Sequence, residues 1–294
     1  MIERLEAYLD RLHWKDIAKL VVHRLGYSVT RIDPIDRSRG ATEDPFLDQQ
    51  RIVQFAGSTK PATVFDVGAN IGQSVKKYRA LFPDARIHAF EPLPKAYRQL
   101  LLAADDAGNT QANQLALHDA PGTRKFCSNR GGANQTSSFL PPDDEVRHSY
   151  PAHAFELEKM IDVQVSTLDD YCAEHNVEHI DVLKMDTQGT ELDILRGGQK
   201  LLEKRAVTLA YIEICFAPLY ANSPLYHRIA TFLEDAGLDL FRIYCQNYGT
   251  AGRHVGGDAV FVERSVLKRY LDQNFAESVA QRERRLAALG ASPP

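Results

Sequence analysis

The stretch that decides the fold is Thr63-Val-Phe-Asp-Val-Gly-Ala-Asn-Ile-Gly-Gln-Ser74. Residues 64–67 are mostly β-branched or aromatic, which predicts a buried strand. Gly68 and Gly72 then predict a tight turn, and apolar residues at helical spacing follow over residues 75–82. A strand, a glycine turn and a helix start form a ligand cradle, because glycines let the backbone approach a ligand closely.

The spacing within this turn indicates which ligand the cradle binds. A dinucleotide site needs G-x-G-x-x-G, whereas this chain has Gly68-x-x-x-Gly72 with Asn70 in the middle. Asp66 precedes the first glycine by two residues, where it would repel a pyrophosphate and attract a cation. S-adenosylmethionine, with a sulfonium and an ammonium group, fits better. The alternative is that Asp66 only satisfies backbone amides of the turn, and this stretch alone does not choose between them.

A second acid supports a nucleoside ligand. Arg86–Phe90 is predicted to be the next buried strand, and Glu91 lies at its carboxyl end. An acid roughly 20 residues beyond the glycine turn is placed to accept hydrogen bonds from ribose hydroxyls. NAD sites share this feature, so it supports a nucleoside without identifying it.

Strand and helix patterns alternate through the rest of the chain. Further strands are predicted at Asn113–Leu117, Ile180–Met185, Val207–Ile214, Leu238–Cys245 and Ala259–Val262. Only a loop joins the last two strands, so they must be antiparallel neighbours. The predicted fold class is therefore α/β, with the seven-stranded, Rossmann-like sheet of class I methyltransferases and an antiparallel last strand. Ser223-Pro224 is predicted to start a helix before the sixth strand.

Four sequence blocks, in this order, resemble the FkbM family of methyltransferases. They are Phe65–Gly72, Phe90–Pro92, Ser166–Asp170 and Lys184–Gly198, and the resemblance covers about residues 60–245. It implies methyl transfer from S-adenosylmethionine to an acceptor hydroxyl, with polyketides and sugars of glycans or glycolipids among the family's acceptors. One position departs from the pattern, because the family more often has Glu where this chain has Gln188.

The predicted cofactor site gathers the ends of the first three strands and of the strand before Asp186. It comprises Asp66, Gly68, Ala69, Asn70, Gly72, Glu91, Leu117, His118 and Asp186. The backbone around Leu117 and His118 is expected to flank the adenine. His118 has an equal alternative as a solvated loop residue.

The predicted catalytic residues are Asp186 and Glu213, with Glu191 as a third candidate. Asp186 and Glu213 end adjacent strands, and an acceptor alcohol must lose its proton to a base or to a metal-acidified site. We therefore predict either that Asp186 is the base or that Asp186 and Glu213 hold Mg²⁺ through oxygen ligands. The alternatives are that Glu213 pairs with Lys184 or an arginine, and that Asp186 caps the next helix.

Residues 128–160 are predicted to form an acceptor lid, because a long polar loop in a compact domain is commonly functional. The amides and hydroxyls of Asn134, Gln135, Ser137 and Ser138 suit a polyhydroxylated acceptor. The alternative is a surface loop held together by its own hydrogen bonds.

The predicted organisation has three parts. Residues 1–57 form a helical extension, with a polar linker or loop from Asp33 to Gly57; residues 58–264 form the methyltransferase domain; residues 265–294 form a terminal helix. Leu267, Leu271, Phe275 and Val279 recur every four residues in that helix. This stripe is expected to pack on the sheet, with a homodimer contact as the alternative.

Composition limits the remaining function classes. The net charge of −4 among 294 residues provides no global basic field for nucleic acid. No apolar run is long enough to span a bilayer, and Met1-Ile-Glu-Arg-Leu-Glu has no signal-peptide pattern, so we expect a cytoplasmic protein. The four cysteines are scattered, which predicts free thiols rather than a zinc site. N-methylation of a small molecule and a catalytically idle cofactor-binding domain remain alternatives.

Overall fold

The computed structural model describes residues 44–57, 61–129, 136–148, 155–249 and 252–288. Residues 1–43 of the predicted helical extension and linker lie outside these ranges, as do Asn134 and Gln135 of the predicted lid. Within the described part of the chain, no helix combines the length and apolar character needed to cross a membrane.

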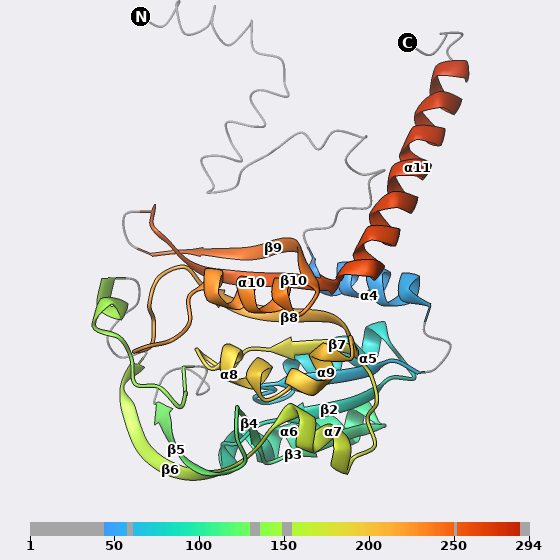
Figure 1. The fold of residues 1–294 in the computed structure, drawn as a ribbon. Helices are drawn as coiled ribbons and strands as arrows, with labels where there is room; N and C mark the ends of the chain where they lie inside the picture. The colour runs from blue at the N-terminus through green and yellow to red at the C-terminus, as the bar shows by residue number, and fades with distance from the viewer. Residues whose placement is uncertain (1–43, 58–60, 130–135, 149–154, 250–251, 289–294) are drawn as a thin grey trace, which may run out of the picture. The chain divides into compact units, whose positions relative to one another are not determined.

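A seven-stranded sheet forms the centre of the described domain (Figure 1). Its strand order is β3-β2-β1-β7-β8-β10-β9. The first five are parallel, whereas β10 runs antiparallel to both neighbours. This confirms the predicted class I methyltransferase sheet. The strand bounds are β1 (Thr63–Val67), β2 (Arg86–Phe90), β3 (Thr110–Asn113), β7 (Ile180–Met185), β8 (Val207–Cys215), β9 (Leu238–Tyr248) and β10 (His254–Glu263).

Helices cover both faces of this sheet. Successive residues of a strand point to opposite faces, so neighbouring residues of β1 pack against different helices. Phe65 packs in a cluster with residues of α7, α8, α9 and α10, whereas its neighbour Val64 packs with residues of α4, α5, α6 and α11. The helix bounds are α4 (Pro45–Ala56), α5 (Gln73–Leu81), α6 (Pro94–Ala107), α7 (Leu168–Glu174), α8 (Glu191–Arg196), α9 (Gln199–Glu203), α10 (Tyr226–Asp235) and α11 (Arg264–Ala288).

Helix α4 lies where the sequence predicted a polar linker. The Asp44 carboxylate caps the helix by accepting from the Phe46 amide, Pro45 is its first residue, and Gly57 ends it in the left-handed conformation. Ile52 and Val53 are buried against the sheet. The linker prediction was wrong because proline and glycine mark both loops and helix ends, and here they mark helix ends.

A second, three-stranded sheet corrects the prediction for residues 113–160. The third core strand is β3, which ends at Asn113, and residues Ala116–Leu117 form β4 in the other sheet. That sheet has the order β4-β6-β5, with β5 at Gly122–Asn129 and β6 at Leu157–Ser166. Strand β5 runs antiparallel to β6. Among the described residues between β5 and β6, Asp144–His148 form a short 3₁₀ turn, η2.

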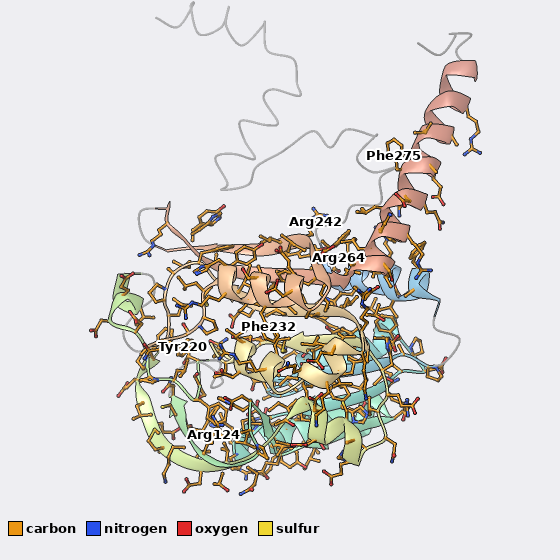
Figure 2. The ribbon with its side chains drawn as sticks, in the orientation of Figure 1. Arg124, Tyr220, Phe232, Arg242, Arg264 and Phe275 are labelled. Atoms are coloured by element: carbon orange, nitrogen blue, oxygen red, sulfur yellow. The ribbon has the colours of Figure 1, made fainter. Side chains whose placement is uncertain are left out.

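Two helix predictions also need correction. Helix α10 begins at Tyr226, so the Ser223-Pro224 pair precedes the helix rather than capping it. In α11, Leu267 is buried, but Leu271 and Phe275 are 51% and 71% exposed. Figure 2 shows Phe275 on the part of α11 that extends away from the sheet. Packing on the sheet therefore accounts only for the start of the predicted stripe. Residues 271–280 are mostly exposed, and none of them is buried.

Candidate active site

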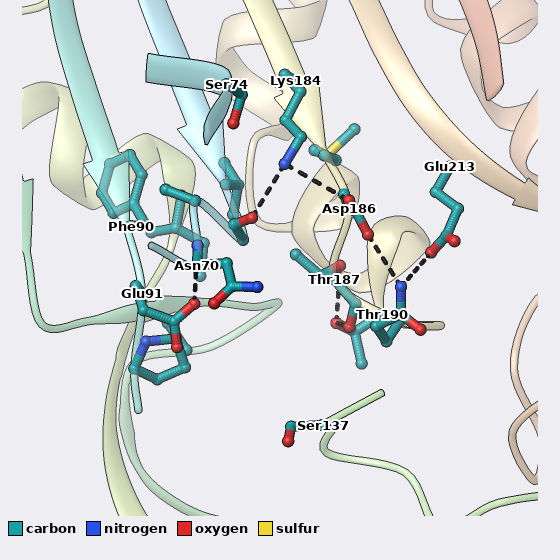
Figure 3. A pocket seen from close by; sticks show the side chains of 18 of the residues that line it. Asn70, Ser74, Phe90, Glu91, Ser137, Lys184, Asp186, Thr187, Thr190 and Glu213 are labelled. Carbon is teal, nitrogen blue, oxygen red and sulfur yellow. Dashed lines mark hydrogen bonds and ion pairs between the residues drawn. The ribbon is translucent and has the colours of Figure 1, made fainter. Parts of the chain in front are cut away.

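A cavity of about 600 Å³ opens at the carboxyl ends of the parallel strands. Figure 3 shows Asn70 and Glu91 on one side of it and Asp186 and Glu213 on the other. It is lined by the turns after β1, β2 and β7, by residues 115–117 and by Ser137. The volume lies within the range of small-molecule and cofactor sites. The predicted convergence of strand ends is therefore present.

The glycine turn after β1 is held tightly against its neighbours. A Cβ on Gly68 would lie 2.0 Å from the Asp186 carbonyl oxygen, and φ at Gly68 is +78°. A Cβ on Gly72 would lie 2.5 Å from the Ala103 Cβ atom. Gly68 and Ala69 line the cavity, whereas Gly72 is not among the lining residues. The structure thus gives Gly72 a packing role between α5 and α6, and its cofactor role stays a prediction.

Glu91 links the first two turns. Its carboxylate accepts hydrogen bonds from the backbone amide of Asn70 at 3.1 Å and from the backbone amide of Leu93 at 2.8 Å. Burial raises the pKa of Glu91 to about 7, although these hydrogen bonds oppose the rise. The Asn70 side-chain oxygen is buried without a partner beside this carboxylate. These acceptors suit the hydroxyl or ammonium donors of S-adenosylmethionine.

Asp66 does not have the direct role that the sequence predicted. It is fully buried, and its carboxylate lies 3.0 Å from the Lys184 ammonium and accepts from the Ser74 hydroxyl. Lys184 and Ser74 line the cavity, whereas Asp66 is not among the lining residues. Because Lys184 balances its charge, Asp66 presents no net negative charge to a ligand. It positions Lys184, which also donates to the Gly68 carbonyl at 3.0 Å.

The apolar side of the cavity contains Leu117 but not His118. Leu117 lies there with Phe90 and Phe139, a setting that suits a flat base such as adenine. His118 instead contacts Asp119 at 2.7 Å and Arg124 at 3.2 Å. His118 therefore does not line the cavity, but at 7% exposed it is not the solvated loop residue of the alternative either. Its ring lies between Asp119, Arg124 and Phe139.

Asp186 and Glu213 are brought together by a residue that the sequence reasoning left without a role. The Gln188 amide nitrogen donates to an Asp186 oxygen at 2.9 Å and to a Glu213 oxygen at 2.7 Å. Burial and the charges of Asp186 and Glu191 raise the pKa of Glu213 well above its usual range. Lys184 lies 3.7 Å from Asp186, so the alternative pairing of Lys184 with Glu213 is not the one observed.

The predicted magnesium site remains a prediction. Among the described residues, no group of three or more His, Cys, Asp or Glu side chains is arranged to hold a metal ion. The Gln188 amide donates to both acids, so it lies where a bridging cation would contact them.

Glu191 holds the turn after β7 rather than facing the cavity. Its buried carboxylate accepts from the amides of Thr187 and Gly189 and from the Thr187 hydroxyl. It is not among the residues that line the cavity. The structure thus shows Glu191 supporting the turn that carries Asp186, and its catalytic role stays a prediction.

The described part of the predicted lid contributes Thr136, Ser137 and Phe139 to the cavity wall. The Ser137 hydroxyl accepts a hydrogen bond from the backbone amide of Asn129. The Ser138 hydroxyl donates to the backbone carbonyl of Gln188 at 2.7 Å. Ser138 is fully buried, so it anchors the segment instead of facing an acceptor.

Three residues of the site were missed or misassigned from sequence. Tyr220 had no role in the sequence reasoning, Lys184 was considered only as a partner of Glu213, and Phe46 was placed in a linker. Phe46 and Lys184 nevertheless line the cavity, and Tyr220 donates to Gln188. A signal was available only for Phe46, since Asp44-Pro45 is a helix-start pattern.

The sheet order and a nucleoside-type cavity define a class I S-adenosylmethionine-dependent methyltransferase. The family model described as "Methyltransferase FkbM domain" matches residues 66–240, and this chain belongs to that family. This agrees with the resemblance drawn from the sequence.

Two curated relatives are similar over most of their own length. The "2-O-methyltransferase NoeI" of Sinorhizobium fredii is 27% identical over 180 residues, which cover 53% of this chain and 73% of the relative. The "Methyltransferase sdnD" of Sordaria araneosa is 29% identical over 202 residues, covering 61% and 74%. Among solved structures, fibrillarin of Aeropyrum pernix with bound S-adenosyl-L-methionine has a TM-score of 0.39 at 13% identity, covering 72% of this chain and 73% of that one.

Proposed function

We propose that this methyltransferase acts on a hydroxyl of a neutral, polyhydroxylated acceptor, such as a sugar of a glycan or glycolipid or a polyketide-type compound. The observation that carries the proposal is the pair of acids, Asp186 and Glu213, on the cavity side opposite Glu91. The name of the relative NoeI, a 2-O-methyltransferase, supports oxygen as the acceptor atom.

The residues of one half of the cavity fit the cofactor. Glu91 and the partnerless Asn70 oxygen offer acceptors, Leu117 and Phe90 offer an apolar wall, and the backbone of Gly68 and Ala69 lines the cavity. S-adenosylmethionine supplies a methyl group carried on a positively charged sulfur. Most of the rate increase is expected from holding the acceptor oxygen in line with that methyl group.

Asp186 is the residue that we propose takes the acceptor proton. Its side chain is 46% exposed and lines the cavity, so an acceptor hydroxyl can reach it. Burial beside Asp186 and Glu191 raises the pKa of Glu213 well above its usual range, which favours its protonated form. We therefore assign the proton-accepting role to Asp186, the more exposed of the two acids.

The test is methyl transfer from isotope-labelled S-adenosylmethionine to a panel of compounds. The panel contains methyl glycosides of neutral hexoses and 6-deoxyhexoses, hydroxylated macrolactones, and amino sugars as the nitrogen counterpart. We expect a methyl ether on at least one hydroxyl compound, located by mass spectrometry. Methylation confined to amines would overturn the proposal in favour of N-methylation. Tight S-adenosylhomocysteine binding without transfer to any compound would favour an idle cofactor-binding domain.

A further inference from the structure

Gln188 occupies the centre of the acceptor side of the cavity. It lies in the turn after β7 with φ at +60°, a conformation that is uncommon for residues other than glycine. Its side-chain nitrogen has two hydrogens, and each is directed to one acid, Asp186 or Glu213 (Figure 3). Both donor capacities of the amide are therefore used on the two acids.

The other end of the same amide has a different partner. The Tyr220 hydroxyl donates to the Gln188 side-chain oxygen at 2.6 Å. Reversing the amide would place its oxygen against two acid oxygens and its nitrogen against the phenol, so the partners determine its orientation. Burial and the nearby Glu213 raise the pKa of Tyr220 well above its usual range, which keeps the phenol a donor.

Gln188 is also tied to the wall segment of residues 136–140. The Ser138 hydroxyl donates to the Gln188 backbone carbonyl at 2.7 Å. The Tyr220 hydroxyl lies 3.1 Å from the Thr136 carbonyl oxygen, which gives the phenol a second acceptor in the same segment. Gln188 thus contacts the two acids through its side-chain nitrogen and Ser138 of the wall segment through its backbone carbonyl. Its side-chain oxygen reaches the same segment only through Tyr220.

We propose that Gln188 is a positioning residue, which orients the Asp186 and Glu213 side chains toward the acceptor. Through Tyr220 and Ser138, Gln188 also couples that orientation to the position of residues 136–140. The inference rests on the proposed function, in which Asp186 accepts a proton. Asp186 is 46% exposed and lies 3.7 Å from the Lys184 ammonium, so the Gln188 hydrogen bond adds a second constraint on the orientation of its carboxylate. A neutral amide can hold both acids, whereas a third carboxylate at this distance would repel them.

The first test separates catalysis from binding. Gln188→Glu keeps the shape of the side chain but adds a negative charge. Gln188→Met removes both amide hydrogens without adding a charge. With the glycoside of the panel that is methylated fastest, we expect kcat to fall about 10- to 100-fold in both variants. A decrease of this size corresponds to the loss of one hydrogen bond to a charged group. KM for S-adenosylmethionine and for the glycoside should change by less than about threefold.

The matched control is Gln199→Glu, the same change of charge at an exposed glutamine of α9. It should retain the kcat of the wild type. Unchanged kcat in Gln188→Met, or a loss confined to KM, would overturn the positioning role.

A second test needs no acceptor. In protein labelled with ¹⁵N-glutamine and saturated with S-adenosylhomocysteine, the Gln188 side-chain amide signal is identified by its loss in Gln188→Glu. We expect its hydrogens to exchange slowly with water in the wild type and at least about tenfold faster in Tyr220→Phe, which loses only the phenol hydroxyl. Equal exchange in both proteins would overturn the coupling. If the panel yields no acceptor, this test still decides the coupling while the proposed function fails separately.

Discussion

Replacing Glu91 with Gln should remove a large part of the pH dependence of folding. The Glu91 carboxyl has a pKa of about 7 in the folded protein, against an ordinary value of 4.5, because it is buried. The folded protein therefore holds this proton more tightly than the unfolded chain does. The contribution to stability is full below pH 4.5 and is lost as the pH rises through about 7.

The size of the effect follows from the two pKa values. Their difference corresponds to about 3.4 kcal/mol, at about 1.4 kcal/mol per pH unit. Between pH 5 and pH 8 the expected loss is about 2.5 kcal/mol, because the unfolded carboxyl is already partly ionised at pH 5. Glu91 is only 6% exposed, so solvent screening does not reduce this estimate much.

Urea unfolding of the cofactor-free protein at pH 5 and pH 8 measures this contribution. Other groups also titrate, so the relevant quantity is the difference between the wild type and Glu91→Gln in their loss of stability over that range. It should be about 2.5 kcal/mol, as worked out from the pKa of Glu91. Glu178→Gln, which removes an exposed carboxyl, should behave as the wild type does. Equal pH dependence in the wild type and Glu91→Gln would refute the reasoning.

Four further predictions follow from the same contacts. Asp186→Asn should lower kcat by about 10²- to 10⁴-fold while S-adenosylhomocysteine affinity, measured by calorimetry, stays within threefold; near-normal turnover would remove Asp186 from the mechanism. EDTA should leave turnover unchanged, because the Gln188 amide already donates to both acids; loss restored by Mg²⁺ would establish the predicted metal. Gly68→Ala should cost about 3 kcal/mol in urea unfolding, since its Cβ meets the Asp186 carbonyl. Removing residues 272–294 should cost less than about 1 kcal/mol, and a concurrent change in sedimentation mass would reveal a homodimer contact.

The sequence alone predicted the elements whose signals are local. The strand at 63–67, its glycine turn and Glu91 after the next strand were all found in place, because periodicity and turn chemistry act over a few neighbouring residues. The hairpin of β9 and β10 was predictable for the same reason, since a short loop leaves two strands no other arrangement. Helix α4 was missed where local signals were ambiguous, at Pro45 and Gly57.

The tertiary structure decided which charges meet. The parallel register of β1 and β7 places Asp66 beside Lys184, so the acid that was predicted to attract the cofactor instead holds a lysine. The turn after β7 directs Gln188 between Asp186 and Glu213, and a buried tyrosine beyond β8 completes that arrangement. Electrostatic partners depend on distances of 3 to 4 Å between residues far apart in the chain. Strand register and turn direction set those distances, and neither is encoded by any one segment of sequence.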